Sequence, residues 1–207
     1  MFSPKNKLAG QRVIITGASS GIGEALAIEC VKRGMHVGLL ARRVDHLARL
    51  AERLRELSSG SGVRIEFASL DVCDTAQVTP IITGLADLLG GLDMLIANAG
   101  ILRMRKVGDG RVERDAQIFA TNVMGAIASS EAAITQFRLQ GKNGGRIVAI
   151  SSYSAFLPLP SSAASRHTAM PCSPAPTSTP PRTAPSCTPR CGARAGIRWS
   201  STSRTST

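Results

Sequence analysis

Three glycines at the end of an apolar segment are the residues of this sequence with the clearest chemical meaning. Gly17, Gly21 and Gly23 follow the β-branched run 12–15 and precede a predicted helix over 24–33. Glycine lets the chain turn tightly and lets a phosphate group approach the backbone N–H groups at the start of a helix. An ordinary glycine-rich turn would contain the same residues, but the flanking strand and helix favour the pyrophosphate of a dinucleotide. The spacing G-x-x-x-G-x-G differs from the common fingerprint G-x-G-x-x-G, so it indicates a distinct family.

Further polar residues follow the other apolar segments or lie in a helix. Asp71, Asn98, Ser151 and Ser152 come after predicted strands, and Asn122 lies within a long helical stretch. Each has an ordinary explanation, because serine and asparagine are common in turns and at strand ends. Singly we would favour that explanation for each residue. Together, and beside the glycine loop, they favour functional roles.

The elements that position these residues alternate between strand and helix. Strands are predicted at 12–15, 36–40, 63–67, 92–97 and 146–150, and helices at 24–33, 44–57, 74–89 and 113–140. Such alternation is typical of a parallel sheet covered on both faces through right-handed crossovers. We therefore predict an α/β fold with a doubly wound, Rossmann-like parallel sheet over residues 8–155, incomplete at the C-terminal end. Asp74 and Gln77 resemble a capping box, and Pro80 should weaken or kink the third helix unless that helix begins late.

The charge of the chain is unevenly distributed. The 207 residues carry 25 Lys and Arg against 14 Asp and Glu, a formal net charge of +11. Residues 1–160 contain every acidic residue and contribute +5, whereas residues 161–207 contain six Arg, no acid and seven of the eleven Pro. We predict a folded dinucleotide-binding domain over 1–160 and a Pro/Ser/Thr/Arg-rich tail over 161–207 that is disordered or out of frame.

The same composition disfavours membrane and secreted proteins. No apolar run approaches the roughly 18 residues that a membrane span needs. The N-terminus lacks the apolar core of a signal peptide. The expectation is a cytoplasmic protein with no membrane partner.

The segment Thr16–Gly23 resembles the cofactor loop of the short-chain dehydrogenase/reductase family. Asp71-Val72 resembles the family's adenine-contacting pair, and Asn98-Ala99-Gly100 resembles its N-A-G motif. Asn122 resembles the helix asparagine that holds a water in the proton relay, and Ser152 resembles the active-site serine. The resemblance implies hydride transfer with a nicotinamide cofactor, catalytic roles for Ser152 and Asn122, and cofactor contacts at Gly17, Ser19, Ser20, Gly21, Ile22, Gly23, Asp71, Val72, Asn98, Ala99 and Gly100.

The end of the second strand indicates which nicotinamide cofactor is bound. An acidic residue about 20 positions after the glycine loop would accept hydrogen bonds from the ribose hydroxyls of NAD. This sequence has Ala41-Arg42-Arg43 there instead. Paired arginines at a helix start are often simply solvated, but Arg42 and Arg43 would attract the 2′-phosphate of NADP. The expected cofactor is NADP(H), with NAD the less favoured alternative.

The sequence departs from the family at the proton donor. The resemblance implies a tyrosine about thirteen residues after the serine, and a lysine four residues later that lowers the tyrosine pKa. Counting from Ser152 reaches Ser165 and then Ala169. The one tyrosine, Tyr153, directly follows the serine, and the last lysine, Lys142, precedes the fifth strand. We therefore expect the catalytic Tyr and Lys to be missing from this chain.

The tail has several possible meanings. After Ala164 the residues resemble a GC-rich gene translated out of register, so we suggest a frameshift near codon 165. A nucleic-acid-binding arm is disfavoured because the six Arg are dispersed and Trp199 is their one aromatic neighbour. A metal site is disfavoured because no paired C-x-x-C spacing occurs among His167, Cys172, Cys187 and Cys191. Neither a metal nor a nucleic-acid partner is expected.

Two functions remain for the whole chain. The first is an NADP(H)-dependent oxidoreductase acting on a small alcohol or carbonyl compound, without the catalytic Tyr and Lys. The alternative is a catalytically inactive, truncated dinucleotide-binding module. Intact members of the family would be homo-oligomers, and loss of the helix after residue 160 would expose apolar surface on the helices over 113–140.

Overall fold

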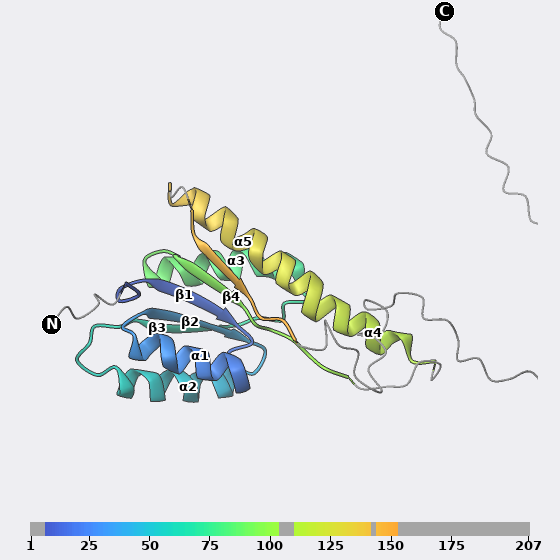
Figure 1. The fold of residues 1–207 in the computed structure, drawn as a ribbon, viewed down its shortest axis with the longest axis horizontal. Helices are drawn as coiled ribbons and strands as arrows, with labels where there is room; N and C mark the ends of the chain where they lie inside the picture. The colour runs from blue at the N-terminus through green and yellow to red at the C-terminus, as the bar shows by residue number, and fades with distance from the viewer. Residues whose placement is uncertain (1–6, 104–109, 142–143, 153–207) are drawn as a thin grey trace, which may run out of the picture. The chain divides into compact units, whose positions relative to one another are not determined.

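The computed structural model describes residues 7–103, 110–141 and 144–152, all within one compact unit. Five parallel strands form a sheet in the order β3-β2-β1-β4-β5 (Figure 1). The strands are β1 (Arg12–Thr16), β2 (His36–Ala41), β3 (Ile65–Ser69), β4 (Met94–Ala97) and β5 (Arg146–Ala149). The described helices are α1 (Gly21–Lys32), α2 (Val44–Leu57), α3 (Thr75–Leu89), α4 (Val112–Phe119) and α5 (Gly125–Leu139), with a π-helical turn (Ala120–Met124) between α4 and α5.

Helices cover both faces of the sheet. α1 and α2 lie on one face, and α3 and α5 lie on the other (Figure 1). The chain winds from β1 outward to β3 on one side, and then returns to place β4 and β5 on the other side of β1. The predicted doubly wound α/β fold is therefore confirmed. In such sheets the crevice for a ligand lies where the winding reverses, at the carboxyl ends of β1 and β4.

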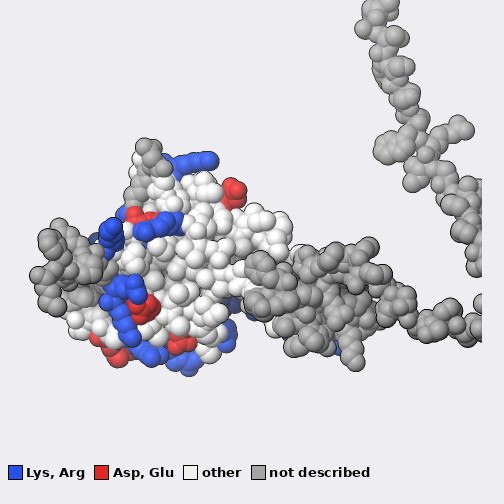
Figure 2. All heavy atoms as spheres, in the orientation of Figure 1, with Lys and Arg blue, Asp and Glu red and all other residues white. Residues whose placement is uncertain are grey.

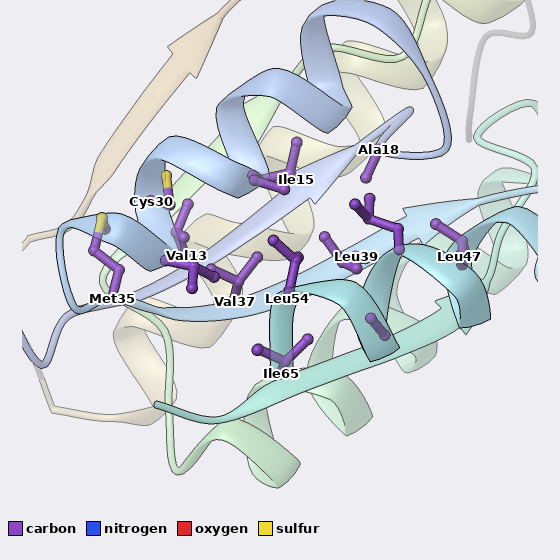
Figure 3. Packing of buried hydrophobic residues seen from close by; sticks show 14 of the residues in the cluster. Val13, Ile15, Ala18, Cys30, Met35, Val37, Leu39, Leu47, Leu54 and Ile65 are labelled. Carbon is purple, nitrogen blue, oxygen red and sulfur yellow. The ribbon is translucent and has the colours of Figure 1, made fainter. Parts of the chain in front are cut away.

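Alternate side chains of the strands build two apolar cores. Val13 and Ile15 of β1 pack with α1 and α2 (Figure 3), whereas Ile14 between them packs in the second core with α3 and α5. All three side chains are fully buried. Each such burial contributes about 1.5–3 kcal/mol relative to an exposed side chain. These β-branched residues are fixed in extended backbone by packing on both sides, as central parallel strands require.

Three local predictions can be compared with the structure, and one of them is wrong. α3 continues through Pro80, although it begins at Thr75 and so does not begin late. Pro80 lies in the second turn of a helix with one face buried, so the packing of that face outweighs one missing backbone hydrogen bond. Asp74 is the N-cap residue of α3, but its side chain makes no capping hydrogen bond, so the capping-box interpretation was wrong. The mostly helical stretch predicted over 113–140 is confirmed, and within it a π-helical turn at Ala120–Met124 joins α4 to α5.

The amino ends of β1 and β4 are joined by a charged pair. The Asp93 carboxylate accepts hydrogen bonds from the Arg12 backbone N–H (2.9 Å), Nε (2.7 Å) and Nη2 (3.0 Å). The two side chains are 21% and 22% exposed, so they are partly shielded from water. Hydrogen bonds between charged groups are stronger than those between neutral groups. The bidentate contact of the Arg12 guanidinium with the Asp93 carboxylate fixes the alignment of β1 and β4.

We predict that Asp93→Ala lowers the free energy of unfolding by about 1–3 kcal/mol, because the Arg12 guanidinium and backbone N–H lose their acceptor. Urea denaturation of the full chain measures this. The control is Glu29→Ala, which removes the exposed pair with Arg33 within α1 and should cost less than about 0.5 kcal/mol. Equal losses in the two variants would contradict the role given to Asp93.

Candidate functional site

The glycine loop lies between β1 and α1, and each glycine has its own structural reason. A Cβ on Gly17 would lie 2.7 Å from Ala99 Cα, and one on Gly23 would lie 2.6 Å from Asn98 Nδ2. These two glycines therefore allow the loop to pack against the end of β4. Gly21 has a φ of +61° and open space where its Cβ would be. There glycine is required by the backbone conformation, which leaves the approach to the start of α1 open.

Hydrogen bonds lock this loop to the segment that follows β4. The Thr16 hydroxyl accepts from the backbone N–H groups of Asn98 (3.0 Å) and Ala99 (3.1 Å). The Asn98 side-chain amide donates to the carbonyl oxygens of Thr16 (3.0 Å) and Gly17 (3.3 Å). Thr16 is 1% exposed, so these groups have no water to replace a lost partner. The carboxyl ends of β1 and β4 are thus held as one unit.

A cleft of about 430 Å³ opens at this point, at the carboxyl ends of the strands. Most of the predicted cofactor-contacting residues line it: Gly17, Ser19, Ser20, Ile22, Arg42, Arg43, Asp71, Val72, Asn98, Ala99 and Gly100. Of the predicted set, Gly21 and Gly23 do not line it. The structure adds four lining residues that the sequence analysis did not single out: Ala41, Leu70, Ile101 and Thr121. Ala41 ends β2 and Leu70 directly follows β3, and this position at the carboxyl end of a strand is the signal that could have identified them.

Two arginines give the cleft a cationic side. Arg43 Nη2 donates to the hydroxyls of Ser19 (3.0 Å) and Ser20 (2.7 Å), so its guanidinium lies against the glycine loop. Arg42 Nη1 lies 3.7 Å from the Asp71 carboxylate. That pair is largely exposed and contributes little stability, so Arg42 can exchange Asp71 for another anion at little cost. Asp71 is the one acidic residue in the lining.

A second cleft, of about 690 Å³, adjoins the first. Both clefts are lined by Ile22 and by the segment 98–101, so they share a wall. The second cleft is lined by apolar side chains of α4, the π-helical turn and α5, and by Asn122, Ser151 and Ser152. The two residues predicted to be catalytic, Asn122 and Ser152, are thus brought together in one cleft. Its larger apolar share suits the less polar part of a ligand.

The side chain of Asn122 is engaged by the protein itself. Its Oδ1 accepts from the Ile101 N–H (2.8 Å) and its Nδ2 donates to the Ile101 carbonyl (2.9 Å). Asn122 is exposed, but these two hydrogen bonds hold its side chain in place. It fastens the lining segment of both clefts to the π-helical turn, and single π-turns within helices often mark functional sites. The amide keeps a second N–H and a second lone pair on Oδ1, which can still bind a water.

Several predicted features fall outside the described residues. Tyr153, Ser165 and Ala169 lie there, as do the cysteines and histidine of the tail. Within residues 7–103, 110–141 and 144–152, no group of three or more His, Cys, Asp and Glu side chains could hold a metal ion. None of the helices in these ranges has the length and apolar character to cross a membrane.

Comparison with known proteins gives a consistent match. The sequence matches the family described as short chain dehydrogenase over residues 11–165. An uncharacterized oxidoreductase of Mycobacterium tuberculosis is 35% identical over 142 residues, which are 69% of this chain and 54% of that protein. The protein 11-beta-hydroxysteroid dehydrogenase-like 3 of Arabidopsis thaliana is 40% identical over 154 residues, 74% of this chain and 48% of that protein. The chain spans about half the length of these two relatives.

Solved structures agree with the fold. A putative short-chain alcohol dehydrogenase from Sinorhizobium meliloti superposes with a TM-score of 0.72 at 31% identity, covering 80% of this chain and 63% of the other. An NAD+-bound xylitol dehydrogenase gives 0.71 at 27% identity, with coverage of 78% and 60%. An alcohol dehydrogenase from Thermococcus sibiricus, complexed with 5-hydroxy-NADP, gives 0.68 at 26% identity, with coverage of 76% and 65%.

The Thr16 hydroxyl offers a test of the site's construction. We predict that Thr16→Val, which keeps the shape of the side chain, lowers the free energy of unfolding by about 2–4 kcal/mol because two partly buried N–H groups lose their acceptor. Thr16→Ser is the control, since it keeps the hydroxyl and should cost clearly less. Thermal and urea unfolding of the full chain measure both. Equal stability of the Val and Ser variants would show that these hydrogen bonds do not hold the site together.

Proposed function

The chain belongs to the short-chain dehydrogenase family, and we propose that it binds NADP(H) in the cleft at the glycine loop. We further propose that its reaction class is hydride transfer between the nicotinamide and a small alcohol or carbonyl compound. The observation that carries the cofactor assignment is the placement of Arg42 and Arg43 in the lining, with Arg43 fastened to Ser19 and Ser20.

The residues of the first cleft fit a dinucleotide. Gly21 leaves open space beside the first turn of α1, and the backbone N–H groups there suit a pyrophosphate. Gly17 and Gly23 let that loop lie close to the end of β4. Asp71 and Val72 line the same cleft, where they would meet the adenosine half of the dinucleotide.

The choice between NADP and NAD rests on this chain's own residues, because one similar structure holds NAD+ and another holds an NADP derivative. The last residue of β2 and the two residues after it include no acid that could accept hydrogen bonds from the ribose hydroxyls of NAD. Arg42 and Arg43 stand there instead, and guanidinium groups bind phosphate through paired charge-assisted hydrogen bonds. The Ser19 and Ser20 hydroxyls already position Arg43 at the loop, which lowers the entropy cost of ordering it on binding.

The second cleft supplies the remaining groups for chemistry. A bound nicotinamide would supply the hydride or accept it. The Ser152 hydroxyl can orient a substrate oxygen by hydrogen bonding, and apolar side chains of α4 and α5 line the same cleft. Asn122 holds the wall between the two clefts through Ile101.

The proton donor is the part of this chemistry that the sequence lacks. No Tyr-x-x-x-Lys occurs after Ser152. We propose that residues 1–160 form the cofactor-binding domain and that the segment after about residue 164 was read out of register. The end of the family match at residue 165 supports this boundary. The second candidate function is therefore a dinucleotide-binding module without turnover, favoured by the same missing pair.

Cofactor preference is tested by binding. We predict that NADPH raises the melting temperature of the full chain more than NADH at equal concentration, because a ligand that binds the folded state stabilises it in proportion to affinity. Arg43→Ala should weaken NADPH binding about 10- to 100-fold, since a hydrogen bond to a charged group contributes about 1.5–3 kcal/mol, and should leave NADH binding nearly unchanged.

The control variant is Arg138→Ala, which removes the same charge from the last turn of α5, away from both cleft linings. Its NADPH affinity should equal that of the parent chain. A preference for NADH would overturn the assignment to NADP(H). If neither nucleotide changes the melting temperature, both proposed functions fail.

Turnover is tested separately. We predict that the full chain oxidises NADPH negligibly with carbonyl substrates, because losing a positioned general acid costs about 10²- to 10⁴-fold in rate. A chain encoded with one base added or removed near codon 165 should contain the Tyr-x-x-x-Lys and recover activity. A rate like that of intact relatives from the chain as written would contradict the prediction. If neither shifted frame encodes the motif, the out-of-register explanation is wrong.

A further inference from the structure

Three side chains that carry or can accept a positive charge lie together at the amino ends of the strands. Arg12 begins β1, His36 begins β2 and Arg64 directly precedes β3. Arg12 is paired with His36, and Val37 is paired with Ile65 on the other side of β2. This register places His36 between Arg12 and Arg64. The strands begin on the left in Figure 1, and Figure 2 shows both basic and acidic side chains on that side of the described part.

The imidazole of His36 takes part in the pairing of β2 with β3. The backbone N–H of Arg64 donates to His36 Nδ1 (2.8 Å), and the Arg64 carbonyl accepts from the N–H of Val37 (2.9 Å). Both backbone groups of Arg64 are therefore bound to β2, one of them through a side chain. A ring nitrogen that accepts a hydrogen bond carries no proton, so this contact requires the neutral imidazole with its proton on Nε2.

The two guanidinium groups beside His36 already have acceptors. Arg12 binds the Asp93 carboxylate, and its Nη1 also donates to the Gly90 carbonyl. Arg64 Nη1 donates to the Leu89 carbonyl (3.1 Å). These two carbonyls belong to the C-terminus of α3, where the partial negative charge of a helix end stabilises cations. A third positive charge at His36 would therefore find its neighbouring carboxylate already paired.

The surroundings of His36 favour its neutral form. Partial burial lowers the pKa of His36, and the charges of Arg64 and Arg12 lower this pKa further, whereas Asp93 opposes them. The folded chain thus holds the proton less tightly than the unfolded chain does. The stability that His36 contributes is therefore complete above the ordinary histidine pKa of about 6.5 and decreases as the pH falls below that value.

We propose that His36 is a pH-sensitive contact that holds the segment leading into β3 against β2 and releases it when the ring is protonated. Protonated Nδ1 is a donor, so it faces the Arg64 N–H as a second donor and the hydrogen bond is lost. The new charge also lies between two guanidinium groups. Because β3 is the edge strand of the described sheet, residues 58–64 can then separate from β2. The contact lies at the opposite end of the strands from the glycine loop, so it does not depend on the proposed function.

The proposal is tested by the protection of the Arg64 backbone N–H against hydrogen exchange, measured by NMR on the full chain. The measurement is made at about pH 7.5 and about pH 5, on either side of the ordinary histidine pKa. We expect the protection factor to fall about 2- to 10-fold at the lower pH, which is the factor that one hydrogen bond contributes. His36→Asn should abolish this pH dependence, because the amide oxygen can accept the same N–H without titrating.

The matched control is His46→Asn, which makes the same change at an exposed position of α2 and should keep the pH dependence of the parent chain. Protection at Arg64 that does not change with pH overturns the proposal, and so does an equal fall in His36→Asn. Titration of the parent chain by NMR gives a second test that needs no variant to fold. The His36 pKa should lie below its value in the urea-unfolded chain, and an equal or higher value overturns the proposal.

Discussion

The hydrogen bonds between Thr16 and Asn98 are the constraint on which the rest of this structure depends. They join the carboxyl ends of β1 and β4, the point where the winding of the sheet reverses and a crevice must form. Gly17 can lie against Ala99 because neither the loop nor the strand end carries a bulky group there. Both clefts use the segment 98–101 as a wall, so the geometry of each is set by the same few contacts.

The charges around the first cleft follow from this arrangement. The loop held at the end of β1 presents Ser19 and Ser20 to the end of β2, where Arg43 begins the turn into α2. The serine hydroxyls accept from the guanidinium and keep it at the loop. Arg42, one residue earlier, is paired only through an exposed contact with Asp71. A phosphate group arriving at this side meets two cations, of which one is already positioned.

The sequence allowed most of the fold and the first cleft to be predicted, because both depend on local patterns. The β-branched runs predict the strands, and the glycine spacing predicts a tight turn. The polar residues at strand ends mark where the strands stop. None of these predictions depends on residues distant in the sequence. The features that were missed depend on tertiary contacts. The two hydrogen bonds of Asn122 join it to Ile101, which lies 21 positions earlier in the sequence. Likewise, the packing of α3 outweighs the local cost of Pro80, and Asp74 makes no capping bond despite its favourable type.

Our central proposal is that the cationic side of the first cleft selects the 2′-phosphate of NADP(H), and this is the claim to test first. The most direct measurement is the ³¹P NMR spectrum of NADP+ titrated with the full chain. The account predicts that the 2′-phosphate resonance shifts and that its pKa falls, because Arg42 and Arg43 favour the dianion. The pyrophosphate resonances should shift with it through the glycine loop. Pyrophosphate shifts with an unchanged 2′-phosphate would contradict the selection by the arginines, and an unchanged spectrum would contradict the site.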